Sequence, residues 1–360
     1  RDGGSMFIDN FNRVTSSADA LLGGAVYVDP YSSLSIRGGS VIEANKVLQT
    51  NSSVNEGGAV YMDSDANNNM YAAMEVNGLV TIADNFVKLG TDASSAEFKD
   101  NVFMKAIENH IEVRDIAAAT SVGVTKNAFH EDGDLKDFTP VAVCLDNSFA
   151  QDSLNAIFAR HTNFYDDQGI YFQYHNDDNP HGPNTIYFGR TWAGVVRTQP
   201  EGFTAQNIDS REELAWAISV VNGLNRQTAA PGTAFKVTAD LDMNEHVWLP
   251  IGSATKPYEG AFNGDGHTID GIRVEYLYGL GAYGMFGYLD NGASVSHTFV
   301  TSGKMEPVIL SNDVTEYIGG LVGVVNSGAT VEGSEAAVTM TTDSLSVIMG
   351  GLVGQNNGLI

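Results

Sequence analysis

Apolar and small residues recur along the chain in short runs that are spelled alike at distant positions. The run GGAVYVD at residues 23–29 returns as GGAVYMD at 57–63, and GGSMFID at 3–9 is a rougher copy. Each run mixes β-branched and aromatic residues and is bordered by Gly, Asp, Asn or Ser, which is typical of a short strand between turns. The pattern predicts one strand-and-turn unit built several times.

The segments that follow these runs also align. LSIRGGSVIEAN (34–45) and MEVNGLVTIADN (74–85) match without a gap, with Asn45 opposite Asn85. In a stack of repeats, equivalent strands pair about 4.8 Å apart. Asparagine amides at equivalent turns can then donate and accept in a ladder. We therefore expect Asn45 and Asn85 to be direct neighbours.

A second set of repeats occupies the C-terminal part. GMFGYLDNGASV (284–295), GGLVGVVNSGATV (319–331) and GGLVGQNNGLI (350–360) share a Gly-apolar-apolar-Gly core followed by an Asn-containing turn. The stretch 248–274 has the same texture and is interpreted as the first member of this set. The copies are unevenly spaced, which argues against a propeller or a helical repeat with a fixed period. Constant strands with variable loops favour an all-β fold, a parallel β-helix (solenoid).

One segment breaks the strand pattern. DSREELAWAISVVNGLN (209–225) carries Ser210 and, three residues later, Glu213, the signature of a capping box. Apolar residues then recur at helical spacing up to the stop signal Asn-Gly at 222–223. We expect one α-helix at about 210–224, which covers the open end of the second β-helical segment.

Composition narrows the range of partners. Asp and Glu number 44 against 19 Lys and Arg, a formal net charge of −25. Such a surface repels the phosphates of nucleic acids and anionic lipid headgroups, so we expect neither nucleic-acid binding nor membrane insertion. No apolar run reaches the length of a membrane span. The single cysteine, Cys144, is expected to be a small core residue.

The repeats resemble known bacterial families. GGLVGVVNSG and GGLVGQNNG resemble the GLUG motif of bacterial cell-surface proteins, and GGAVYVD with GGSVIEAN is similar to the pectin-lyase-like β-helices of large adhesins. The resemblance implies two right-handed β-helical segments, pectin-lyase-like at 1–200 and GLUG-type at 201–360. Residues 98–200 are interpreted as degenerate coils closing the first. It also implies an extracellular location on the surface of a gut bacterium.

The same resemblance bears on the extent of the chain and on peptidase chemistry. Both ends fall inside a repeat, so the chain is interpreted as a slice of a longer polypeptide, monomeric within it. Some relatives belong to immunoglobulin A-cleaving metallopeptidases. HEDGD at 130–134 lacks the second histidine of a zinc-peptidase motif. Zinc peptidase chemistry is therefore not expected.

Two polar stretches could bind metal ions. DSDANNN resembles the start of a calcium loop, with oxygen ligands at alternate positions: Asp63, Asp65, Asn67 and Asn69. The glycine expected at the sixth position is Asn68, and an Asn-rich loop is the simpler interpretation. HNDDNPH gathers four side chains suited to zinc: His175, Asp177, Asp178 and His181. A polar loop is favoured there. We therefore expect no cofactor, with calcium at residues 63–69 as the alternative.

Aromatic residues are the candidates for ligand contact. Four tyrosines cluster in an irregular stretch and could stack on sugars: Tyr258, Tyr276, Tyr278 and Tyr283. Trp216 and Trp248 are expected in the core instead.

Repetition without a convergent site predicts a non-catalytic role. We expect an adhesin or stalk module that presents β-helix faces and loops to a glycan or protein on a host or neighbouring cell. A polysaccharide lyase or hydrolase is the competing hypothesis, with carboxylates from YDDQG (Asp166, Asp167) or NDDNP. A dedicated binder of a host protein such as immunoglobulin is the third.

Overall fold

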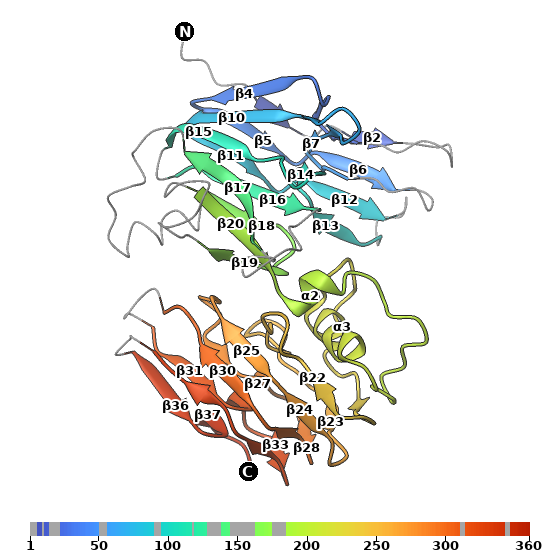
Figure 1. Ribbon diagram of the computed structural model, residues 1–360, viewed down its shortest axis with the longest axis vertical. Coiled ribbons are helices and arrows are strands. Elements are labelled where there is room, and N and C mark those ends of the chain that lie inside the picture. Colours follow the sequence, from blue (N-terminus) through green and yellow to red (C-terminus); the bar gives the residue numbers. More distant parts are fainter. Residues whose placement is uncertain are drawn as a thin grey trace. The chain divides into compact units, whose positions relative to one another are not determined.

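The computed structural model is an all-β protein, as predicted, and its strands are short (Figure 1). Two helices, α2 (Trp192–Val195) and α3 (Arg211–Asn222), occur among the described residues. The structure describes residues 6–8, 11–13, 22–49, 56–89, 95–116, 119–127, 138–144, 163–174, 185–309, 314–342 and 346–360. The chain divides into two compact units. Unit 1 is Arg1–Gly169 with Gln173–Gly189, and unit 2 is Ile170–Phe172 with Arg190–Ile360.

Unit 2 contains three successive rounds of five short strands. The first round is β23 (Ala261–Asn263), β24 (Thr268–Asp270), β25 (Ile272–Glu275), β26 (Ala282–Tyr283) and β27 (Phe286–Leu289). The second is β28 (Ser294–Ser296), β29 (Phe299–Val300), β30 (Gly303–Glu306), β31 (Glu316–Gly319) and β32 (Val322–Val325). The third is β33 (Thr330–Glu332), β34 (Glu335–Ala336), β35 (Thr339–Met340), β36 (Val347–Gly350) and β37 (Val353–Asn356).

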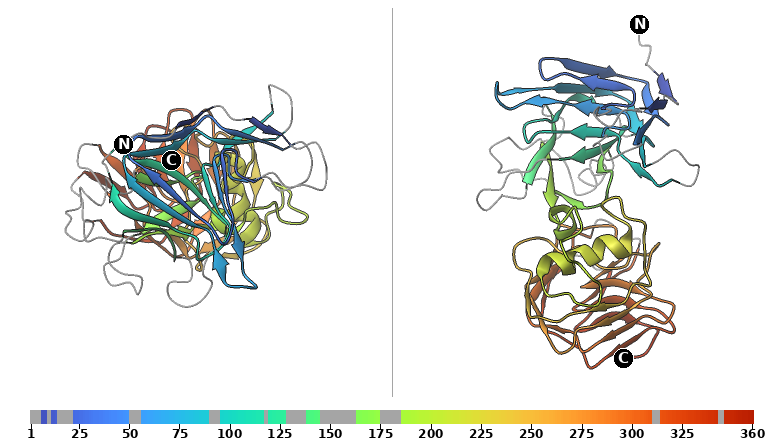
Figure 2. Two further views of the ribbon diagram at one scale, coloured as in Figure 1. Left: turned by 90° about the horizontal axis from the view of Figure 1, so that it is seen from above. Right: turned by 90° about the vertical axis from the view of Figure 1, so that its right-hand side faces the viewer.

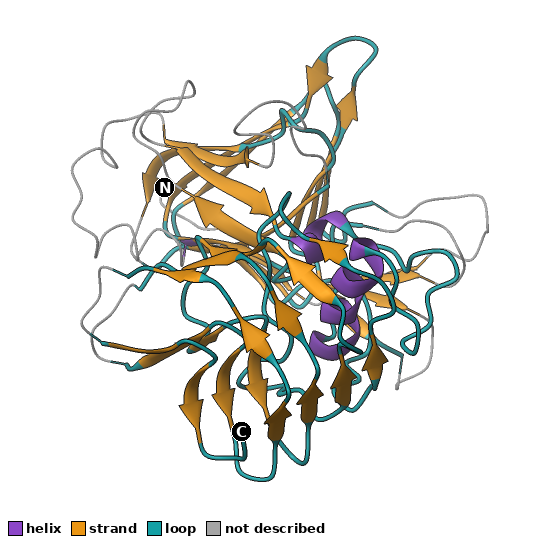
Figure 3. Ribbon diagram, turned by 60° about the horizontal axis from the view of Figure 1, so that its bottom comes forward, coloured by secondary structure: helices purple, strands orange, loops and turns teal. Residues whose placement is uncertain are grey.

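Every strand of a round pairs in parallel with the strand of the same rank in the next round. Figure 3 shows these strands in rows. Two shorter strands precede the first round and pair with β23 and β24: β21 (Phe235–Lys236) and β22 (Leu241–Asp242). The sequence segment 248–274 therefore does belong to this set of repeats.

The repeated glycines of unit 2 lie at equivalent positions. Phe286, Val322 and Val353 share one register, which brings Gly320 level with Gly351. A Cβ atom on Gly320 would stand 2.4 Å from the carbonyl oxygen of Gly351. Neighbouring rounds therefore approach too closely there for any side chain, which explains why the motif repeats its glycines.

Unit 1 follows the same plan with four strands in a round. The first round is β3 (Val26–Val28), β4 (Ser33–Arg37), β5 (Ser40–Glu43) and β6 (Lys46–Gln49). The second is β7 (Val60–Met62), β10 (Ala73–Gly78), β11 (Val80–Ala83) and β12 (Phe86–Leu89). A hairpin interrupts the second round: β8 (Ser64–Asp65) and β9 (Met70–Tyr71). The two rounds pair in parallel throughout, and the predicted alignment of their sequences is confirmed.

The first of the three opening runs pairs differently from the prediction. β1 (Met6–Ile8) lies beside β5, with Met6 opposite Val41, and β2 (Phe11–Arg13) lies beside β6. The segment GGSMFIDN is thus the counterpart of GGSVIEAN at 38–45, and not of 23–29. Both segments have serine as their third residue, whereas GGAVYVD has alanine there. This serine indicated the correct pairing, which the shared Gly-Gly did not.

The later part of unit 1 is less regular, as expected. β14 (Val102–Met104), β15 (Ile111–Ile116) and β16 (Ser121–Lys126) continue the parallel pairing, as do β17 (Phe138–Cys144) and β18 (Phe164–Asp166). Antiparallel strands are added at two places, β13 (Glu97–Lys99) and β20 (Thr185–Arg190). The two strands predicted around a polar loop are present, β20 and β19 (Tyr171–Tyr174).

Apolar side chains fill the interior of each unit in columns. In unit 1, Val60, Val102 and Val124 share one register and are fully buried. In unit 2, Phe262 and Val295 do the same. Alternation along each strand sends every second side chain inward, and the parallel register places like residues above one another. Burial of these apolar side chains stabilises each unit.

Helix α3 occupies the segment predicted to be helical. The hydroxyl of Ser210 accepts from the Glu213 N–H at 3.3 Å, and the Glu213 carboxylate accepts from the Asp209 N–H at 2.9 Å. The helix ends at Gly223 in the left-handed region, φ 69°. Its Asn222 side chain bonds to residues 250 and 252 of unit 2. In Figure 2 it lies at the end of unit 2 away from the C-terminus.

Helix α2 was not predicted. It is one turn long, with Thr191 as its N-cap, and four residues are too few to show a helical period. Trp192 and Trp216 are buried on α2 and α3, and Trp248 is buried as well, which confirms the expectation that Trp216 and Trp248 belong to the core.

Candidate functional site

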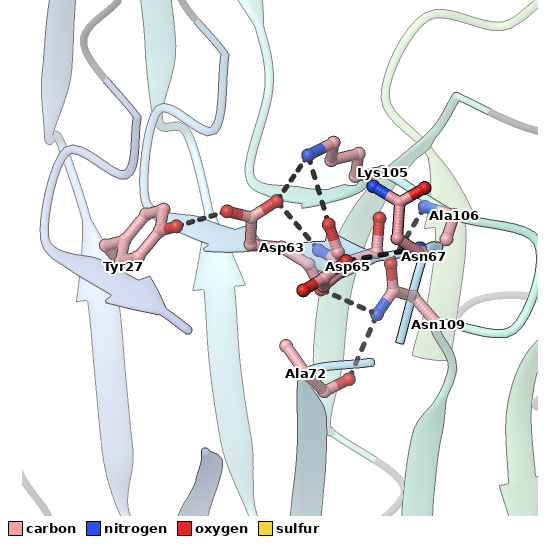
Figure 4. Close-up of polar contacts among 9 residues, drawn as sticks. Tyr27, Asp63, Asp65, Asn67, Ala72, Lys105, Ala106 and Asn109 are labelled. Atoms are coloured by element: carbon pink, nitrogen blue, oxygen red, sulfur yellow. Dashed lines mark hydrogen bonds and ion pairs between the residues drawn. The ribbon is translucent and has the colours of Figure 1, made fainter. Parts of the chain in front are cut away.

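The stretch proposed to bind calcium forms the exposed hairpin β8–β9. Asp63 stands immediately before β8, Asp65 ends it, and Asn67 lies at the exposed tip (Figure 4). The Asn67 N–H donates to Asp65 at 3.2 Å, which closes the turn. Asn69 adopts a left-handed conformation, φ 54°, and its side-chain oxygen accepts from Tyr71. The Asn and Asp residues of the hairpin therefore form its turn through side-chain hydrogen bonds and a left-handed backbone conformation, as these residue types commonly do.

The carboxylate of Asp63 already has several partners. Its Oδ1 accepts from Lys105 Nζ at 2.6 Å and from the Ser64 N–H at 2.7 Å. Its Oδ2 accepts from the Tyr27 hydroxyl. Partial burial favours the protonated form, but the bonds from Lys105 and Tyr27 outweigh it and lower the pKa of Asp63. Asp63 is thus an ionised anchor for two side chains from neighbouring segments.

Asp65 is engaged separately. Its Oδ2 accepts from Asn68 Nδ2 at 2.7 Å and from the Tyr31 hydroxyl at 3.0 Å, and these bonds lower the pKa of Asp65. The two carboxylates share one hairpin but face different partners. Among the described residues, no group of three or more His, Cys, Asp or Glu side chains is placed to hold a metal ion. Calcium binding by Asp63, Asp65, Asn67 and Asn69 stays a prediction.

Two tyrosines bonded to this hairpin were missed in the sequence. Tyr27 is 45 % exposed and Tyr31 is 60 % exposed. The Tyr27 ring stacks on Tyr61 with centroids 5.8 Å apart, and Tyr61 stacks on Phe103 at 5.1 Å. Burial of the hydroxyl and its bond to Asp63 raise the pKa of Tyr27 to about 12. The phenol is therefore neutral and donates at physiological pH.

We call the set around these rings the hairpin surface, which comprises the exposed Tyr27, Asp29 and Tyr31 and the half-buried Asp63 and Asp65. Tyr27 lies inside the repeated run GGAVYVD, which was interpreted only as a strand and its turn, so its exposure was not predicted. The alternation of side chains between the two faces of a β-strand could have indicated this exposure. Tyr27 stands between Val26 and Val28, so its side chain leaves the strand on the opposite face from theirs. The segment VYVDPY thus carried two tyrosines with a turn between them.

The tyrosines that were predicted to contact a ligand lie elsewhere in unit 2. Tyr258 and Tyr283 are fully buried. The Tyr258 hydroxyl donates to the Thr233 carbonyl at 2.9 Å, and the Tyr283 hydroxyl accepts from the Leu280 N–H at 3.3 Å. Two core rings therefore stand where an exposed shelf was expected, because the next rounds of strands pack over them.

The remaining two members of that set, Tyr276 and Tyr278, are half-buried. Tyr276 adopts a left-handed backbone conformation, φ 60°. With Tyr258 and Tyr283 inside the core, the four residues do not present one continuous aromatic face.

A ladder of amides runs through unit 1 and ends at Asp167, one of the carboxylates considered under the competing enzyme hypothesis. Asn85 Oδ1 accepts from Asn45 Nδ2 at 2.8 Å, and Asn85 Nδ2 donates to Asn101 Oδ1 at 2.8 Å. The predicted contact between Asn45 and Asn85 is confirmed. Asn101 then donates from its backbone N–H and its Nδ2 to the two oxygens of Asp167, at 2.6 and 2.5 Å.

Asp167 thus has a structural partner. Burial raises the pKa of its carboxyl well above the usual range, although the bonds from Asn101 act in the opposite direction. A Cβ on Gly123 would stand 2.2 Å from Asp167 Oδ1. Gly123 therefore makes room for this end of the ladder.

Glu316 is a buried acid that belongs to none of the motifs recognised in the sequence. It is 8 % exposed, and its Oε2 has no hydrogen-bond partner among the described residues. Burial raises the pKa of Glu316 and outweighs the hydrogen bond with the Tyr283 side chain, which acts in the opposite direction. The carboxyl is more easily accommodated in the protonated form.

His175, Asp177, Asp178 and His181 lie outside the described residues. Cys144 ends β17, opposite Val113 of β15.

Comparison of the chain with family models, with curated proteins and with solved structures gives no match. In the described part of the chain, neither helix has the length and apolar character needed to cross a bilayer.

Proposed function

We propose that the chain is a non-catalytic adhesin or stalk module on a bacterial surface, built in both units as a right-handed parallel β-helix. The observation that carries the proposal is the parallel register repeated round after round. In unit 2 the chain visits the same five sheets in the same order three times. A coiled β-chain follows such a path, and the GLUG-type and pectin-lyase-like resemblances agree with it.

The outward faces of unit 1 suit a rigid display scaffold. Glu75 on β10 pairs with Arg114 on β15 at 2.7 Å and with Arg37 on β4 at 3.7 Å. Such ion pairs contribute little stability individually, yet they keep the outer face solvated and in register. A stacked scaffold of this kind holds its loops at fixed positions, which favours recognition of a glycan or protein on another cell.

The excess of acidic residues is consistent with this role. A net charge of −25 keeps the module soluble and repels anionic polymers. It also steers the choice of partner away from nucleic acids.

Adhesion tests the proposal directly. Beads coated with the full chain should be retained on mucin, on epithelial cells or on other bacterial cells more strongly than beads coated with heat-denatured chain. The same preparation is incubated with pectin, alginate, mucin and glycosaminoglycans, and products are measured. Retention without turnover supports the adhesive role. Polysaccharide cleavage that is lost on changing Asp177 or Asp178 overturns it in favour of an enzyme.

A further inference from the structure

The two tyrosines of the hairpin surface are prepared for contact before any ligand arrives. Tyr27 rests on Tyr61 by one ring face, with planes 10° apart, and its hydroxyl is bound by Asp63. Tyr31 is held by Asp65 at 3.0 Å. Because the rings are already fixed, binding costs little further side-chain entropy. Tyrosine is one of the residue types enriched among the side chains that dominate binding at protein interfaces.

The charge around these rings is negative. Asp29 is exposed, and Asp63 and Asp65 both have lowered pKa values and remain ionised at neutral pH. In the described part of the chain, Lys105 is the cation bonded to this group, and it is paired with Asp63. Aromatic faces attract cations, and the whole chain, at −25, draws positive partners toward itself. The complementary ligand is therefore basic.

The spacing of the two anchors suggests the form of that ligand. Asp63 and Asp65 are two residues apart where the hairpin begins, and alternate residues of an extended strand have Cα atoms about 7 Å apart. The tyrosine hydroxyls are bonded to them one each. An extended peptide presents its alternate side chains at the same spacing. Basic residues at positions i and i+2 of a partner would therefore meet the two tyrosines together.

We propose that the hairpin surface binds an extended basic segment of a partner protein, with alternate Arg or Lys side chains lying on Tyr27 and Tyr31. Arginine fits best, because its planar guanidinium stacks on an aromatic ring while donating to a neighbouring carboxylate. This inference rests on the proposed adhesive function and names the ligand class for it.

A labelled octapeptide of alternating Arg and Ser tests the site on the full chain. Fluorescence anisotropy should show binding at about 20 mM salt that weakens strongly at about 300 mM, because exposed charge pairs are screened. A peptide with Asp in place of Arg should not bind. The double variant Tyr27→Leu, Tyr31→Leu keeps the net charge and should lose about tenfold or more in affinity.

Matched variants separate site binding from attraction to an acidic protein. Tyr27→Phe keeps the ring and should retain affinity within about threefold. Glu201→Gln removes one exposed charge in unit 2 and should leave the affinity unchanged. If the double variant is poorly folded, Tyr31→Leu alone decides, since that side chain is largely exposed.

Two results overturn the inference. One is equal affinity of the wild type and the tyrosine variants, or an equal loss in Glu201→Gln. The other is failure of the peptide to bind while neutral oligosaccharides do, which would make the surface a glycan site. Coated beads that adhere without peptide binding reject this ligand class and leave the adhesive function standing. If the beads bind the peptide but do not adhere, the adhesive function is rejected and the basic ligand class stands.

Discussion

At the scale of single residues, the buried amides of unit 1 show how a repeat is held in register. Asn45 and Asn85 are fully buried, and each rung of their ladder satisfies donors and acceptors that water cannot reach. Asn85 contributes most, since it also donates to the carbonyls of Ile42 and Ala83 at 2.9 and 2.8 Å. A one-residue slip of either strand would break all of these bonds at once.

Replacing the central rung should therefore be costly. Asn85→Ala removes the Oδ1 that accepts from Asn45 and the Nδ2 that donates to Asn101, both in a buried place, and we expect a loss of about 3 kcal/mol in the free energy of unfolding. Urea denaturation followed by circular dichroism measures it. Asn357→Ala, at an exposed site, is the control and should change stability by less than about 0.5 kcal/mol. Equal stability of the two variants would refute the structural role of the ladder.

Glu316 gives a prediction with a definite pH dependence. Its folded pKa is raised above the ordinary value of 4.5, so the folded state holds the proton more tightly than the unfolded state. The stability that this group contributes is present below pH 4.5 and is lost as the pH rises through the folded pKa. Glu316→Gln removes that loss, and at pH 7 it should raise the Tm by about 2–4 °C.

The gain from Glu316→Gln should disappear below about pH 4, where the wild-type carboxyl is protonated as well. Thermal melts at several pH values follow it. Glu335→Gln, on the exposed strand β34, serves as the matched control. A variant that is less stable than the wild type at pH 7 would mean that the Glu316 carboxylate has a favourable partner.

At the scale of elements, the sequence predicted what depends on local pattern. The pairing of Val26 with Val60 follows from two runs of the same spelling, and α3 follows from a cap, an apolar period and a terminal glycine. The run at 3–9 was matched to the wrong copy, since a shared Gly-Gly cannot distinguish two corners that both require glycine.

Burial was harder to predict than strand formation. Tyr258 and Tyr27 both occur beside turns, yet one is fully buried and the other is 45 % exposed. The difference is set by the neighbouring round: Tyr258 lies under Phe286, whereas β3 is the terminal strand of its sheet among the described residues. Contacts of this kind join residues far apart in the chain, so a local pattern does not contain them. The hairpin surface could therefore be identified only from the structure.

At the scale of the whole molecule, the dominant physical feature is unbalanced charge. Self-repulsion at −25 opposes the compact state, and salt screens it over a Debye length that falls from about 30 Å at 0.01 M to about 8 Å at 0.15 M.

Salt should therefore stabilise the protein. Between 0.01 and 0.15 M NaCl we expect the Tm to rise by about 2–5 °C, because relief of repulsion outweighs the screening of exposed ion pairs. Differential scanning calorimetry measures the shift, and an equal concentration of a neutral solute is the control. A fall in Tm would show that the ion pairs, such as Glu75 with Arg114, dominate instead.

The equal ranks of the strands in unit 2 have a consequence for heredity. Phe262, Val295 and Val331 occupy one position in three successive rounds, so excising a round and rejoining the chain at equivalent residues brings a strand against another proper partner. Unequal crossing-over between the duplicated stretches of its gene can thus lengthen or shorten the product by whole rounds. A lineage could adjust the reach of this protein in a single recombination event, without having to redesign a core.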